Sequence, residues 1–118
     1  MRVLLWSDME GMSRIATIAS AGRYSPVLSD RPPQVPDEVV AAATGLLHDG
    51  ANAVFVVNWH GLGWPNVLWD ELPERVAPAD NNAWSEGVDA MLQVGLHAEP
   101  GRRTDSSAIR WCRVCAWR

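Results

Sequence analysis

Three short apolar segments constrain the fold of this chain more than any other feature. They are "RVLLW" at 2–6, "NAVFVVN" at 52–58 and "DAMLQVGL" at 89–96. Continuous apolar runs of this length are typical of strands that are covered on both faces, as in a parallel sheet. Because these strands alternate with helical patterns, the sequence predicts an α/β fold, with a mostly parallel sheet and flanking helices.

The clearest helical pattern begins at Asp37. Apolar residues recur at helical spacing after it, acidic residues occupy the first turn, and Gly50 stands where a C-terminal cap belongs. This pattern predicts a helix over about residues 37–48. The preceding segment, 20–36, carries four prolines, so we expect a long surface loop there.

The stretch between the second and third strands is harder to interpret. Residues 66–72 and the segment around 84–89 could each hold a short helix. The prolines of "LPERVAPAD" at 72–80 predict a break in regular structure between them.

Composition limits the class of protein and its partners. The 118 residues fit one domain, and their formal net charge of −4 disfavours nucleic acid or an anionic membrane as a partner. No apolar run approaches the roughly 20 residues of a membrane span, and the chain opens on a strand-like segment without a cationic leader. We therefore expect a cytoplasmic protein that does not contact a membrane.

The last part of the chain differs in composition from the rest. Thirteen of the fourteen acidic residues precede position 100, whereas half of the ten basic residues follow it. We expect residues 1–100 to form an α/β metal-binding domain. The Arg-rich tail, 101–118, has no sustained helical or strand period, and we expect it to be poorly ordered.

Metal-binding side chains follow each of the three predicted strands. Asp8 and Glu10 come directly after the first, His60 after the second and His97 after the third. The carboxyl ends of parallel strands meet at one edge of a sheet, where open α/β folds gather their ligands. The sequence therefore predicts that these four residues share one site.

Carboxylate oxygen and neutral imidazole nitrogen suit Zn²⁺ and similar divalent ions. We expect Asp8 and Glu10 to point the same way because alternate residues do so in extended backbone, and Gly11 to let the chain turn sharply after them. A bound divalent ion makes its water acidic enough to act as a nucleophile at neutral pH, so the set favours hydrolysis.

Each residue alone is also compatible with an ordinary structural role. The two carboxylates could cap a helix or lie in a solvated loop, and either histidine could simply reach solvent. His48, near the end of the predicted helix, suits the helix dipole and is assigned no role in the site. A receiver-like signalling module that binds Mg²⁺ is an alternative, but this chain has no lysine and places a histidine where that class needs an aspartate.

At these motifs the chain resembles the D-aminopeptidases of bacterial dipeptide-transport operons, which are zinc metallopeptidases with two metal ions. The similarity lies in "SDMEG", "VVNWHG", "SEGVDAML" and "VGLHA", and it covers residues 1 to about 98. The resemblance implies that Asp8 bridges two zinc ions, that Glu10 and His97 complete one ion's ligands, and that His60 helps to hold the other. It also implies an aminopeptidase acting on short peptides with D-residues, and a ring-shaped homo-oligomer.

Members of that family are longer and supply a further histidine and glutamate downstream. Here no histidine follows His97 and no glutamate follows Glu99. We therefore expect this chain to be truncated relative to the family, to retain about one zinc ion and to be weakly active or inactive, with no catalytic residue assigned. A truncated chain without function is the remaining alternative.

Overall fold

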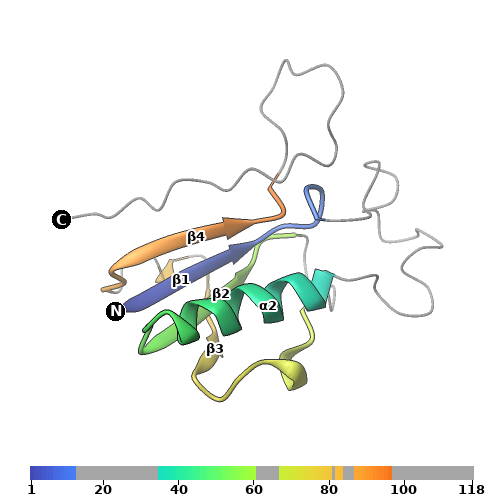
Figure 1. Cartoon of the computed structure of the whole chain (residues 1–118). Helices are drawn as coiled ribbons and strands as arrows, with labels where there is room; N and C mark the ends of the chain where they lie inside the picture. The colour runs from blue at the N-terminus through green and yellow to red at the C-terminus, as the bar shows by residue number, and fades with distance from the viewer. Residues whose placement is uncertain (13–34, 61–66, 81, 84–86, 97–118) are drawn as a thin grey trace.

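The computed structural model describes residues 1–12, 35–60, 67–80, 82–83 and 87–96 (Figure 1). Their elements are the strands β1 (Arg2–Ser7), β2 (Ala53–Asn58), β3 (Val76–Pro78) and β4 (Ala90–Val94), the helix α2 (Val35–His48) and the 3-10 helix η2 (Trp69–Glu71). The predicted tail, the domain boundary near residue 100 and most of the predicted 20–36 loop lie outside these residues.

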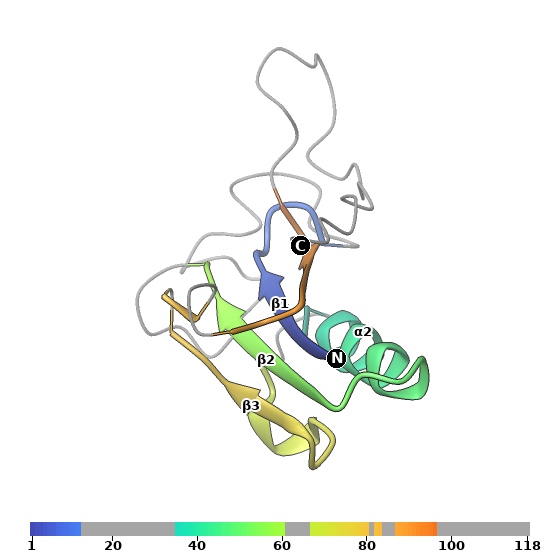
Figure 2. The ribbon, with the colours of Figure 1, turned by 90° about the vertical axis from the view of Figure 1, so that its left-hand side faces the viewer.

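The four strands form one parallel sheet in the order β3-β2-β1-β4. The strand β1 lies inside the sheet, where Val3 pairs with Val54 of β2 on one side and with Ala90 of β4 on the other. The helix α2 covers one face of this sheet (Figure 2). The predicted α/β class is confirmed, with α2 as the covering α-helix in the part of the chain that the structure describes.

Both faces of β1 are buried, which explains its continuous apolar sequence. Val3 and Leu5 point toward α2, where they pack with Val39 and Ala43 of the helix. Leu4, between them, points to the opposite face and packs with Val57. Successive side chains of a strand point to opposite faces, so a strand whose central positions are all apolar needs apolar cover on both sides.

The helix α2 ends as predicted at His48 and begins two residues earlier than predicted. Gly50 has a φ of +97°, and the N–H groups of Gly50 and Ala51 donate to the carbonyls of Leu47 and Leu46. This is the Schellman arrangement, which glycine favours because it has no Cβ. At the other end, Val35 and Pro36 belong to the helix, since a first-turn residue needs no intrahelical N–H bond.

In the segment 66–80, one expectation is confirmed in part and another is wrong. Of the helix considered at 66–72, only the three-residue η2 forms among its described residues. The stretch 72–80, expected to lack regular structure, contains the short edge strand β3, which pairs with β2. Pro78 is tolerated because it ends that edge strand, where a missing N–H breaks no interior ladder. Residues 87–89 precede β4 without helical structure, and 84–86 lie outside the described residues.

Candidate metal centre

The loop after β1 is held by the core on one side and by β4 on the other. Asp8 continues the sheet, because its N–H donates to the carbonyl of Val94 at 3.0 Å. A turn follows, in which the N–H of Met12 donates to the carbonyl of Met9 at 3.0 Å. Both methionine side chains are fully buried in the core beneath α2. The polar residues Asp8 and Glu10 therefore stand on either side of Met9, and the two buried methionines hold the loop against the core.

Two glycines let this loop approach the end of β4. The N–H of Gly11 donates to the carbonyl of Gly95 at 2.7 Å, and Gly95 has a φ of +72°. A Cβ on Gly11 would overlap the carbonyl of Leu96, and one on Gly95 would overlap that of Asp8. Gly11 does lie in a turn, as expected, but without a positive φ, so close approach is the reason for glycine at this position.

His60 lies just beyond β2 and faces both carboxylates. Its Nδ1 is 3.0 Å from Oε2 of Glu10 and 3.4 Å from Oδ1 of Asp8. The N–H of Trp59 donates to the carbonyl of Ser7 at 2.8 Å, which extends the β1–β2 ladder to the residue before the histidine. One ligand atom from each of the three residues lies within 4.8 Å of the others.

The cluster is largely shielded from water. The side chains of Asp8, Glu10 and His60 are 5%, 15% and 18% exposed. Burial raises the pKa of Glu10, but hydrogen bonds from its surroundings, including Asp8 and His60, and the charge of His60 outweigh burial and hold that pKa below its ordinary value. Glu10 is therefore an anion at neutral pH. Oδ1 of Asp8 also accepts the N–H of Met9 at 2.8 Å, which fixes the carboxylate's orientation.

The donor set fits a divalent ion. Tetrahedral zinc with ligands at about 2.1 Å places neighbouring ligand atoms about 3.4 Å apart. The two distances from the His60 nitrogen, 3.0 and 3.4 Å, are close to that spacing. A divalent cation would also place its positive charge beside both carboxyl groups of this shielded site.

The structure brings together Asp8, Glu10 and His60, three of the four residues expected at this edge. The fourth, His97, lies outside the described residues. His48 ends α2 with its side chain 88% exposed, apart from the cluster. The two carboxylates converge through the turn that begins at Met9, and the extended backbone expected from their spacing is absent from that turn.

Sequence reasoning missed the residues that support the cluster. Met9 and Met12 anchor the loop in the core, and Gly95 receives it. The spacing of the methionines in "DMEGM" was an available signal, because it places an apolar side chain on each side of Glu10. Gly95 gives no comparable signal, since its contact with Gly11 joins residues far apart in the chain.

Comparison with known proteins shows the family of this chain. The D-aminopeptidase family profile matches residues 1–108, nearly the whole chain, and this protein belongs to that family. No curated protein and no solved structure matches the chain. Family membership agrees with the resemblance at the strand-end motifs and supports a peptidase function over the receiver-like alternative.

None of the described helices has both the length and the apolar character needed to cross a membrane.

Proposed function

We propose that this chain is a zinc-dependent aminopeptidase, which removes the amino-terminal residue from short peptides that contain D-residues. The family match supports peptidase chemistry, and the cluster supports metal dependence. The observation that carries the proposal is the convergence of three donor groups, from the ends of β1 and β2, within 4.8 Å of one another.

In this proposal Asp8 and Glu10 provide anionic oxygens, and His60 provides the nitrogen. His97 would join them at the end of β4, as expected from the sequence. A zinc ion held there would polarise a peptide carbonyl and acidify a water molecule, which is the chemistry that peptide hydrolysis needs. The protein's own contribution is to fix the donors before an ion binds. The hydrogen bond from Met9 orients Asp8, and the ladder bond at Trp59 positions the segment that carries His60.

Zinc content tests metal dependence directly. After zinc loading and dialysis, we expect about one zinc ion per chain, because the described residues contain one donor cluster. Asp8→Ala should abolish tight binding and His60→Gln should weaken it. His48→Gln is the matched control, since it removes an exposed histidine at the end of α2. Equal zinc content in wild type and Asp8→Ala would refute the assignment.

Peptide hydrolysis tests the substrate class. Release of alanine from D-alanyl-D-alanine, compared with the L,L peptide in excess zinc, measures the expected preference for D-residues. The weak or absent activity expected from the sequence remains a prediction, and the same assay measures it. Hydrolysis that is faster for the L,L peptide would contradict the proposed substrate.

The cytoplasmic location and the homo-oligomer also remain predictions. Light scattering after size exclusion would give the mass of the assembly, and a mass equal to one 13.0 kDa chain would contradict the expected oligomer.

A further inference from the structure

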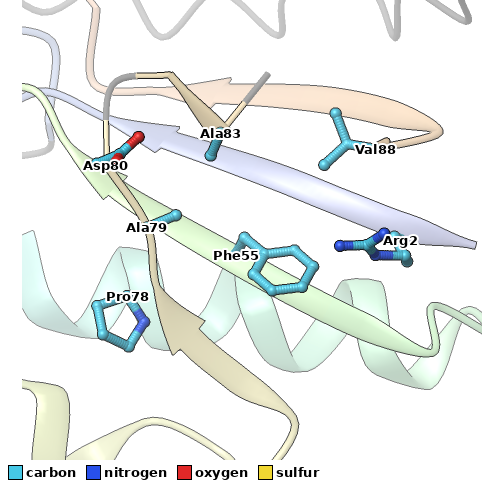
Figure 3. A pocket seen from close by; sticks show the side chains of 7 residues that line it. All are labelled: Arg2, Phe55, Pro78, Ala79, Asp80, Ala83 and Val88. Carbon is cyan, nitrogen blue, oxygen red and sulfur yellow. The ribbon is translucent and has the colours of Figure 1, made fainter. Parts of the chain in front are cut away.

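A second feature with recognisable chemistry lies on the sheet face opposite α2. It is a hollow of about 280 Å³ (Figure 3). Side chains from β1, β2 and the segment from β3 to β4 line it: Arg2, Phe55, Pro78, Ala79, Asp80, Ala83 and Val88. The volume is near the lower end for small-molecule sites, which limits an occupant to a small molecule.

A guanidinium group lies at one end of the hollow. The Arg2 side chain places its guanidinium carbon 5.1 Å from the centre of the Phe55 ring, within the range of a cation–π contact. A guanidinium stacked on a ring keeps its N–H edge available for a carboxylate. Asp89 accepts the backbone N–H of Arg2 at 2.6 Å, and among the described residues no carboxylate forms an ion pair with the Arg2 guanidinium.

A carboxylate lies at the other end. Figure 3 shows Asp80 across the hollow from Arg2, with Phe55 and Ala79 between them. One oxygen of Asp80 accepts the N–H of Asn82 at 2.7 Å, and the Asp80 carbonyl accepts that of Ala83 at 3.1 Å. This turn fixes the carboxylate's position and leaves its second oxygen able to accept from a ligand.

The surface between the two charges is apolar and made largely of small side chains. Ala79 and Ala83 create the space, and the Phe55 ring, Pro78 and Val88 complete the lining. Ala83 belongs to the buried cluster on this face, so the lining is part of the folded core. Opposite charges at the two ends of an apolar hollow complement a molecule with the reverse arrangement.

We propose that this hollow binds a short zwitterionic peptide of two residues with small apolar side chains. Arg2 would hold the peptide's carboxylate, Asp80 its ammonium group, and the alanine-lined surface its side chains. A free amino acid carries both charges on one carbon, whereas two extended residues hold them about 7 Å apart. Arg2 and Asp8 lie at opposite ends of β1, about 20 Å apart at 3.3 Å per residue, so the Arg2 end of the hollow is remote from the metal cluster.

Binding to the 118-residue chain in excess EDTA tests the proposal independently of the metal cluster. The probes are alanyl-alanine, N-acetyl-alanyl-alanine, alanyl-alanine amide and valine, titrated while backbone amide shifts are followed by NMR. We expect the dipeptide to shift the amides of Phe55, Ala79 and Ala83. Each of the other three probes should bind at least about tenfold more weakly, since each loses a charge-assisted contact. Valine or the acetylated peptide binding as tightly as the dipeptide would overturn the proposal.

Two variants test the assigned charges. Asp80→Asn keeps an oxygen that can accept the N–H of Asn82 and removes only the charge, and Arg2→Gln removes the guanidinium. Each should weaken dipeptide binding about tenfold without changing the urea midpoint much. The matched controls are Asp70→Asn and Arg75→Gln, which change the same charges outside the hollow. Wild-type affinity in both Asp80→Asn and Arg2→Gln would overturn the proposal.

Discussion

Gly11 and Gly95 meet backbone to backbone, and their contact joins the loop that carries the candidate metal ligands to the end of β4. The hydrogen bond from Gly11 to Gly95 measures 2.7 Å, and neither residue has room for a Cβ. Asp8 and Glu10 immediately precede Gly11, and His97 lies two residues after Gly95. This contact therefore determines how closely the loop that carries Asp8 and Glu10 approaches the end of β4.

Gly95→Ala should destabilise the protein and weaken zinc binding. The positive φ alone costs an alanine about 1 kcal/mol, and displacing the carbonyl of Asp8 should bring the total to about 2–4 kcal/mol. Urea unfolding and zinc titration measure the two effects. The matched control is Gly45→Ala in α2, where a Cβ meets nothing within 4 Å and should add about 0.5–1 kcal/mol of stability. An unchanged urea midpoint in Gly95→Ala would contradict the close approach.

Gly50→Ala separates backbone strain from crowding. Gly50 also has a positive φ, but a Cβ there has no neighbour within 4 Å. We expect a loss of about 1 kcal/mol from the left-handed conformation alone. Because Gly50 lies just before the start of β2 and His60 follows the end of that strand, zinc affinity should not change. Weakened zinc binding in Gly50→Ala would show that the effect of Gly95→Ala on zinc is not local.

Met9→Ala should affect both stability and the metal centre. The Met9 side chain is fully buried, so its removal leaves a cavity and should lower the free energy of unfolding by about 2–4 kcal/mol. The same loss frees the loop between Asp8 and Glu10, which should lower zinc affinity. Met9→Leu conserves volume and should cost less than about 1.5 kcal/mol. If Met9→Ala binds zinc as tightly as Met9→Leu, burial of Met9 does not position the ligands.

The metal-free protein should lose stability in acid because Glu10 becomes protonated there. Its folded-state pKa lies below the ordinary value, so its stabilising contribution is present above the unfolded-state pKa and is lost as pH falls through the folded-state pKa. In EDTA, the urea midpoint should therefore fall from about pH 5 downward, and Glu10→Gln should reduce that slope. Glu74→Gln is the matched control for removing one carboxylate at the surface. Identical slopes in wild type and Glu10→Gln would contradict the lowered pKa.

The three long strands and α2 could be predicted because each contains its own signal. Continuous burial explains "RVLLW", and the helical spacing before Gly50 explains the position where α2 ends. The strand β3 could not be found this way. It has three residues, ends in proline and exists through pairing with β2, which is a tertiary contact without a periodic pattern.

The gathering of Asp8, Glu10 and His60 could be predicted from the sequence, but the geometry of the cluster could not, and the placement of His97 stays a prediction. Because β1 and β2 are parallel, Asp8 and His60 follow strand ends at the same edge of the sheet, and this does not depend on the conformation of the loops. The convergence of Glu10 on the same nitrogen depends on the turn at Met9, which follows from methionine burial and the contact between Gly11 and Gly95. Such contacts depend on packing between segments that are distant in the chain.

The ladder bonds beside Ser7 and Asp8 determine how the candidate site would exchange an ion. The Ser7 carbonyl, at the end of β1, accepts from Trp59, and the N–H of Asp8, the next residue, donates to Val94. Backbone opening at Asp8 therefore requires the end of β1 to separate from the end of β4, which costs more than the motion of an exposed side chain. The Asp8 amide should accordingly be among the slowest to exchange with deuterium, and ions should enter and leave by side-chain motion while the backbone stays closed.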